Sequence, residues 1–97
     1  EQGGTRPVVV LQNDVGNRYA STLIVATVTS RTEKKKHQPT HVLIDHNTAF
    51  EKPSVVQLEQ IFTIDKSRVQ RFLGQLTQPE MYQIEEAISS SLNLNGG

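Results

Sequence analysis

Two polar side chains stand where they could act together on an anion. Arg6 lies just before a short apolar run, and Thr29 ends a second apolar run after a turn-forming segment. If the two runs form adjacent antiparallel strands, Arg6 and Thr29 come to the same end of the pair. A guanidinium can bind phosphate oxygens through paired hydrogen bonds, and a threonine hydroxyl can donate one more. The simpler alternative is a solvated arginine and a threonine that only favours the strand.

The histidines suggest another chemistry, because imidazole titrates near neutral pH. The spacing of His37, His41 and His46 does not bring them together, so we interpret them as surface or structural residues. The basic run at residues 34–36 is more typical of a solvated loop than of a binding patch. Cysteine is absent, and no Asp, Glu and His residues show the spacing of metal ligands. We therefore expect neither a metal nor a cofactor.

The composition limits the chain to one small domain. The 97 residues include ten basic and ten acidic side chains, so there is no overall positive field to attract a nucleic acid. Any positive charge that binds a nucleic acid would then have to be local. No apolar run approaches the roughly 18 residues of a membrane-spanning helix, so we expect no membrane segment and a cytoplasmic protein.

The apolar pattern predicts four antiparallel strands. Residues 7–12 and 22–30 flank a turn at 13–17, where Asn, Asp and Gly accept turn conformations. In the second strand, the odd-numbered residues from 23 to 29 share one face and the even-numbered residues from 24 to 28 share the other. A polar loop at 31–39, a strand at 41–45, an irregular segment at 46–53 and a strand at 54–64 follow. The connections are too short for parallel crossovers.

Two helices are expected after the last strand. Asp65 could cap a short helix that carries Val69, Phe72 and Leu73 and stops at Gly74. Residues 77–80 (TQPE) form a capping box that opens a longer helix. Its apolar stripe consists of Met81, Ile84, Ile88 and Leu92. The predicted fold is α+β and mainly β, a small, strongly bent antiparallel sheet with a C-terminal helix packed on it.

Several strings of the chain resemble, in order, the MazF/PemK family of toxin endoribonucleases, in particular its Gram-positive branch. These are residues 1–8 (EQGGTRPV), 12–17 (QNDVGN), 24–29 (IVATVT), 39–42 (PTHV), 54–55 (SV), 58–61 (LEQI) and 63–66 (TIDK). The resemblance covers nearly the whole chain. It implies an SH3-like barrel with short C-terminal helices, the fold shared by the CcdB and Kid toxins.

The same resemblance implies a function. Such a toxin is one half of a type II toxin–antitoxin pair, and it cleaves single-stranded mRNA at selected sequences without metal, through attack by the 2′-hydroxyl. Matched to the family motif, Arg6 and Thr29 are the catalytic residues. The general base stays open, since arginine remains protonated in proteins; Glu1 is a candidate. The expected RNA-binding residues are Gln2, Gly3 and Gly4 in a flexible flap, and Ser54, Glu59 and Gln60 along the last strand.

The resemblance also implies a homodimer and a MazE-like antitoxin. Three features depart from the family. The chain begins after the position of the family's first strand, which we expect an upstream segment to supply, Phe62 replaces an arginine, and residues 46–53 follow no family pattern. The rival interpretation is a non-enzymatic toxin of the same fold that binds a protein target such as DNA gyrase. The pair of Arg6 and Thr29 favours the nuclease, because a binding module needs neither.

Overall fold

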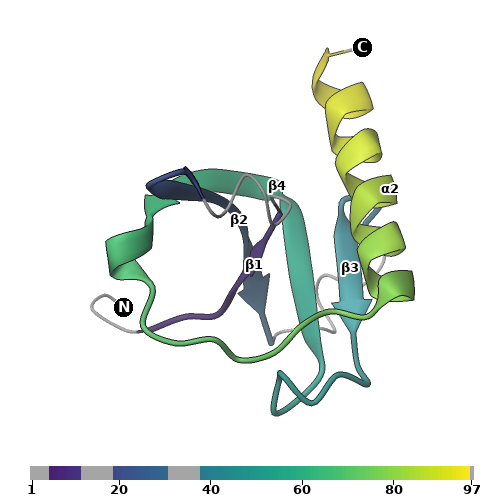
Figure 1. Ribbon diagram of the computed structural model, residues 1–97. Helices are drawn as coiled ribbons and strands as arrows, with labels where there is room; N and C mark the ends of the chain where they lie inside the picture. Colours follow the sequence, from purple (N-terminus) through teal and green to yellow (C-terminus); the bar gives the residue numbers. More distant parts are fainter. Residues whose placement is uncertain (1–4, 12–18, 31–37, 97) are drawn as a thin grey trace.

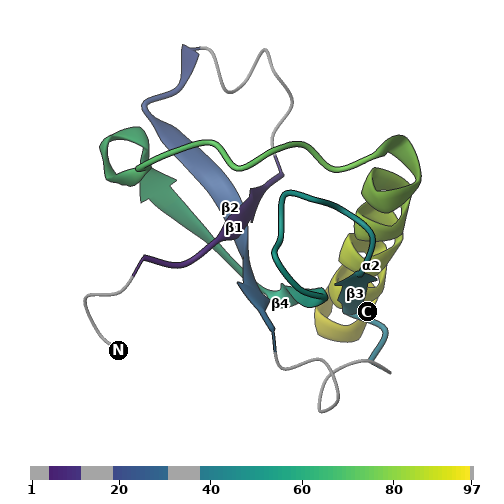
Figure 2. The ribbon, with the colours of Figure 1, turned by 90° about the horizontal axis from the view of Figure 1, so that it is seen from below.

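The computed structural model describes residues 5–11, 19–30 and 38–96, which form one antiparallel sheet and one α-helix. In chain order the elements are β1 (Val8–Val10), β2 (Thr22–Thr29), β3 (His41–Ile44), β4 (Ser54–Asp65), the 3₁₀ helix η2 (Lys66–Arg68) and α2 (Gln78–Gly96). The strand order is β1–β2–β4–β3, and all neighbours are antiparallel. Figures 1 and 2 show that the sheet curls into a half-barrel and that α2 stands beside β3.

A break in the pairing of β4 with β2 accounts for the curl. Ala26 pairs with Ile61, but the next residue, Thr27, pairs with Gln57, so residues 58–60 have no partner on β2. Extra residues on one strand of a pair bend that strand and increase its twist. Figure 1 shows β4 turning over the sheet along its length. Residues 54–58 are buried, whereas every residue of β4 from 59 onward is at least partly exposed.

Side chains alternate along the strands, which gives the sheet an α2 face and an opposite face. In β2 the predicted alternation is confirmed, because Ala26 and Val28 lie in the core beneath α2. Leu23 and Val25 point to the opposite face and are also buried there, as expected of a sheet that curls around its own side chains. The core of the α2 face consists of Val9, Ala26, Val28, Val42, Ile44, Val56, Leu58, Ile84 and Ala87.

The N-terminus of α2 is fixed by the predicted capping box. The Thr77 amide donates to Glu80 Oε1 over 2.7 Å, and the Glu80 amide donates to Thr77 Oγ1 over 3.3 Å. Asn47 Nδ2 also donates to Glu80 Oε1, over 2.9 Å, and so attaches the start of the helix to the segment between β3 and β4. Three members of the predicted apolar stripe are confirmed, since Ile84 is buried and Met81 and Ile88 are half-buried, and the side chain of Leu92 lies outside the described part of the structure.

The prediction of a short helix after Asp65 is wrong. Only Lys66–Arg68 form a single 3₁₀ turn, the Asp65 side chain caps nothing, and Val69 has extended backbone angles. Residues 69–77 then run in a non-helical conformation from the end of β4 to the start of α2, across the opening of the half-barrel (Figure 1). An extended residue advances about 3.3 Å and a helical residue about 1.5 Å, so a helix here would not cover this span.

Gly74 marks a close approach instead of the predicted helix stop. Its φ is 153°, and a Cβ at this position would lie 2.8 Å from the Cβ of Ala49. Asn47 Nδ2 donates to the carbonyl oxygen of Gln75 over 2.9 Å in the same region. The crossing segment therefore rests against residues 47–49, and only glycine fits at its closest point.

The remaining predictions follow the structure closely. β1 is shorter than predicted, although the Leu11 amide still donates to the carbonyl oxygen of Ile24 over 2.9 Å. The predicted strands at 41–45 and 54–64 are confirmed within one residue at each end. The turn at 13–17 and most of the loop at 31–39 lie outside the described residues. Within the described part of the chain, no helix is long and apolar enough to cross a membrane.

Ile84 is 1% exposed and fills the space between α2 and the sheet. We expect Ile84→Ala to lower the free energy of unfolding by about 2–4 kcal/mol, because it removes buried methyl groups and leaves a cavity. Urea denaturation followed by far-UV circular dichroism measures this loss. The control Tyr82→Ala removes a 58% exposed ring from the same helix and should cost much less. Equal losses for the two variants would contradict the position of Ile84 in the core.

Candidate functional site

A row of paired residues crosses the opposite face of the sheet. Val8 pairs with Thr27, Thr27 pairs with Gln57, and Gln57 pairs with His41, so the row includes one residue from each strand. Three of its four members are polar. Because side chains two residues apart share a face, Thr29 lies on this same face, next to Thr27.

The register of β1 and β2 relates Arg6 to Thr29. The ladder ends at Val8 and Thr27, and two further steps of the same register would set Arg6 across from Thr29. In both ribbon views, however, the chain before β1 turns away from the end of β2 (Figures 1 and 2). Thr5 Oγ1 donates there to Gln70 Oε1 over 3.0 Å. The two residues thus lie at the same end of the β1–β2 pair, with Arg6 exposed and Thr29 half-buried. Their joint action stays a prediction.

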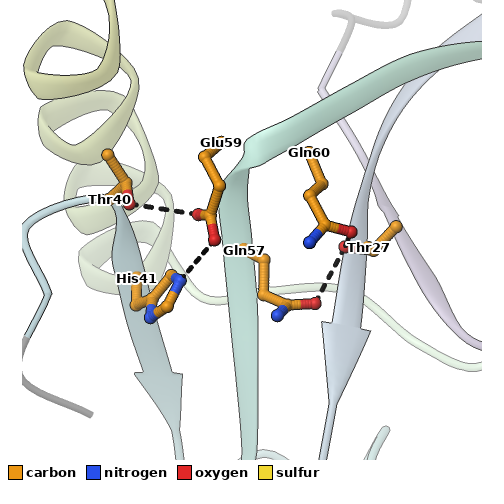
Figure 3. Close-up of polar contacts among 6 residues, drawn as sticks. All are labelled: Thr27, Thr40, His41, Gln57, Glu59 and Gln60. Carbon is orange, nitrogen blue, oxygen red and sulfur yellow. Dashed lines mark hydrogen bonds and ion pairs between the residues drawn. The ribbon is translucent and has the colours of Figure 1, made fainter. Parts of the chain in front are cut away.

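Thr27 ties β2 to β4 on both sides of the unpaired segment. Its hydroxyl lies 2.9 Å from Gln57 Oε1 and 3.2 Å from Gln60 Oε1, as Figure 3 shows. Gln57 comes before the three unpaired residues, and Gln60 is the last of them. One threonine hydroxyl therefore lies between the two ends of the bend and donates its single proton to one of the two oxygens at a time.

Glu59 ties the same bend to β3. Its Oε1 accepts from Thr40 Oγ1 over 3.0 Å, and its Oε2 lies 2.7 Å from His41 Nε2 (Figure 3). The Leu58 amide donates to the carbonyl oxygen of Thr40 over 2.8 Å. The His41 side chain is 1% exposed and the Glu59 side chain 35% exposed. The prediction that His41 is structural fits this contact, and Glu59 acts here as a support within the sheet.

The surroundings of Glu59 favour its charged form. Partial burial of the carboxyl raises its pKa, but hydrogen bonds from His41, from its own backbone amide and from Thr40, together with the positive charge of protonated His41, outweigh that effect. The net result is a pKa of Glu59 below the ordinary value. The Glu59 side chain therefore stabilises the bend more as a charged carboxylate than as a protonated carboxyl group.

The other predicted site residues are spread out. Ser54 is 5% exposed, pairs with Ile44, and donates its hydroxyl to the carbonyl oxygen of Lys52 over 3.0 Å. Gln60 is exposed. His46 lies on the surface, 3.5 Å from Asp45. Glu1, Gln2, Gly3, Gly4, His37 and the basic run at 34–36 lie outside the described residues. Among the residues that are described, no group of three His, Cys, Asp or Glu side chains could hold a metal ion.

Sequence reasoning missed Thr27, Thr40 and Gln57 as parts of this site. A weak signal was present, because Gln57 interrupts the apolar run of residues 55–58. Thr27 also shares a face with Thr29 by simple alternation. Neither signal could indicate that the two side chains meet, since the break in register that aligns them is not visible in the sequence.

Comparison with known proteins identifies the family. Residues 1–92 match the family described as PemK-like, MazF-like toxin of type II toxin–antitoxin system. The chain belongs to this family, as the resemblance of its sequence segments predicts.

Solved structures show the same fold. The Mycobacterium tuberculosis toxin MazF-mt6 is 26% identical with a TM-score of 0.81, over 91% of this chain and 86% of that chain. An endoribonuclease from a mycobacterial species in complex with its cognate antitoxin is 22% identical with a TM-score of 0.82, over 100% and 90%. A structure described as an endoribonuclease from a mycobacterial species, with no antitoxin named, is 22% identical with a TM-score of 0.80, over 96% and 85%. The predicted mainly β toxin fold is confirmed, with one C-terminal α-helix in place of several short ones.

The lowered pKa of Glu59 predicts the direction of an acid effect. A depressed pKa gives stability that is fully present above the ordinary pKa of glutamate, about 4.3, and that is lost as the pH falls through the lower pKa of the folded state. We expect Glu59→Gln to reduce the unfolding free energy at pH 7 by less than about 1 kcal/mol, because the group is one-third exposed. The variant should also lose less stability between pH 5 and 3 than the parent.

Urea denaturation at stepped pH measures both effects. Glu85→Gln, an exposed glutamate of α2, serves as the matched control and should keep the parent's profile. If Glu59→Gln and the parent lost stability in parallel on acidification, the contact with Thr40 and His41 would not favour the charged carboxylate.

Proposed function

We propose that this toxin is an endoribonuclease that cuts single-stranded mRNA at selected sequences without a metal ion. The observation that supports it best is the register of β1 and β2, which brings Arg6 and Thr29 to one end of the pair. The polar row of the opposite face passes through Thr27, two residues from Thr29 along β2. The mycobacterial endoribonucleases of the same fold support the class of reaction.

In the proposed reaction, Arg6 and Thr29 act on the scissile phosphate. The guanidinium binds two phosphate oxygens and stabilises the negative charge that grows during attack. The Thr29 hydroxyl donates a further hydrogen bond to the same group. The 2′-oxygen forms a bond to phosphorus, and the bond to the 5′-oxygen breaks. The products are a 2′,3′-cyclic phosphate and a 5′-hydroxyl end.

Proton transfer requires a further group. The 2′-hydroxyl must lose its proton to a base, and the leaving 5′-oxygen must gain one. Arg6 is a poor base because guanidinium stays protonated. Glu1 belongs to the same N-terminal segment and is our candidate for this role, with Gln2, Gly3 and Gly4 as the flap over the RNA backbone.

Among the residues predicted to bind RNA along β4, Gln60 is the best placed. It is exposed and lies at the bend, with its Oε1 3.2 Å from the Thr27 hydroxyl. Both carboxylate oxygens of Glu59 are already engaged by Thr40 and His41, so we propose that Glu59 supports the RNA-binding surface from within. Ser54 is buried and contributes to the base of the β3–β4 pair.

We further propose that the toxin works in the cytoplasm as a homodimer and is neutralised by an acidic, MazE-like antitoxin. The mycobacterial endoribonuclease that binds its cognate antitoxin supports a partner of this kind. A segment that is disordered alone and folds on the toxin could cover Arg6 and the polar row at once. No observation favours the rival function of binding a protein target such as gyrase.

The test is cleavage of a long single-stranded RNA by the purified toxin in EDTA. The parent should cleave it, and Arg6→Ala should be slower by about 10²–10³-fold, as for loss of one preorganised donor to the transition state. Arg6→Lys should rescue little, because an ammonium lacks the forked geometry of guanidinium. Arg6 is exposed, so the unfolding free energy should hardly change.

Arg71→Ala, another exposed arginine, serves as the matched control and should cleave like the parent. Near-parental cleavage by Arg6→Ala would refute its role. Activity that vanishes in EDTA and returns with magnesium would refute the metal-independent reaction.

A further inference from the structure

Gln57 is a buried polar residue whose hydrogen bonding is incomplete. It is 8% exposed and lies in the middle of the polar row, between Thr27 and His41. Its Oε1 accepts from the Thr27 hydroxyl over 2.9 Å. Within the described part of the chain, its amide N–H₂ group has no partner. Buried donors are almost always satisfied by protein, water or a ligand, so this group calls for an acceptor.

The Thr27 hydroxyl sets the direction of the Gln57 amide. It has a single proton, and its nearer acceptor is Gln57 Oε1, at 2.9 Å against 3.2 Å for Gln60 Oε1. Figure 3 shows the amide nitrogen of Gln57 turned away from Thr27. The opposite face therefore has an amide donor whose orientation Thr27 fixes, beside the bend of β4.

The position of this donor relates it to the proposed RNA site. Thr27 and Thr29 are two residues apart on β2, which corresponds to about 6.6 Å along a strand. A neutral amide gains less from a phosphate than a charged guanidinium does, so Arg6 suits the backbone and Gln57 suits a base. Carbonyl oxygens and ring nitrogens on the edges of unstacked RNA bases are acceptors that an amide N–H₂ can recognise.

We propose that Gln57 is a specificity-determining residue, whose N–H₂ group, oriented by Thr27, donates to an acceptor on the edge of an RNA base. This inference rests on the proposed endoribonuclease function and adds to it the chemical rule by which one base is selected. Gln60 stands at the edge of the same surface.

The test is a set of short single-stranded RNAs that differ by one base at each position around the mapped cleavage site. Gln57→Met keeps the length of the side chain and removes the donors. At one position, the ratio of cleavage rates between the best and the worst base should fall about tenfold, the scale of one good base contact. Gln57→Glu keeps the shape but replaces the donors by acceptors. At the same position, it should shift the preference towards bases that present an amino group.

Gln78→Met, an exposed glutamine at the start of α2, is the matched control and should keep the parent's preference. If both Gln57 variants fail to fold by circular dichroism, Thr27→Val takes their place. It removes the hydroxyl that orients Gln57 and should weaken the preference at the same position.

The outcomes separate this inference from the function on which it rests. If the parent cleaves RNA and the variants keep its base preference, the role of Gln57 is overturned while the nuclease stands. An equal slowing on every sequence, or an unchanged preference with an altered molar mass in light scattering, would likewise overturn it, because Gln57 would then have a structural or interface role. No cleavage by the parent would overturn the proposed function and this inference together.

Discussion

The structure depends on the break in register between β2 and β4. Pairing steps from Ala26 and Ile61 directly to Thr27 and Gln57, and three residues of β4 are left between them. This bend lets one strand belong to two differently oriented parts of the sheet. The part before the bend is buried, with Val56 and Leu58 in the core beneath α2, and the part after it forms the curled, more exposed wall of the half-barrel.

Side chains from both sides of β4 contact the bend, and the two faces of the sheet differ in character. Thr27 of β2 contacts Gln57 and Gln60, and Thr40 and His41 on the β3 side contact Glu59. The α2 face is apolar and stabilises the fold. The opposite face combines buried apolar side chains, Leu23, Val25 and Val55, with the polar row next to Thr29. The contacts across the bend fix the position of that row.

The sequence predicts the elements well where local physics decides them. Strand alternation in β2 and the capping box of Thr77 and Glu80 depend on neighbours a few residues away, and both are confirmed. The short helix expected after Asp65 does not form, because the chain must cross the half-barrel there. This requirement of the tertiary structure overrides the local helix propensity. Gly74 does not end a helix. Glycine is needed there because the backbone passes close to Ala49, which is 25 positions away in the chain.

The candidate site was predicted less completely than the fold. The segments that resemble the family indicated Arg6, Thr29, Glu59 and Gln60, but such segments do not show which side chains are in contact. The contact of Thr27 with Gln57 depends on the break in register, and the apolar pattern of β4 on either side of Gln57 gives no sign of it. Glu59 resembled a group that faces RNA, whereas its partners Thr40 and His41 lie in the protein.

The central claim is that RNA lies across the opposite face, over Arg6, Thr29 and the amides of Gln57 and Gln60 beside Thr27. The most direct test is NMR titration of the ¹⁵N-labelled toxin with a single-stranded RNA that has a 2′-deoxy nucleotide at the cleavage position, so that binding occurs without attack. We expect the side-chain amide signals of Gln57 and Gln60 and the backbone signal of Thr29 to shift, while the side-chain signals of Gln78 and Gln83 on α2 stay in place. Shifts confined to α2, with the signals of Gln57 and Thr29 unmoved, would contradict the account.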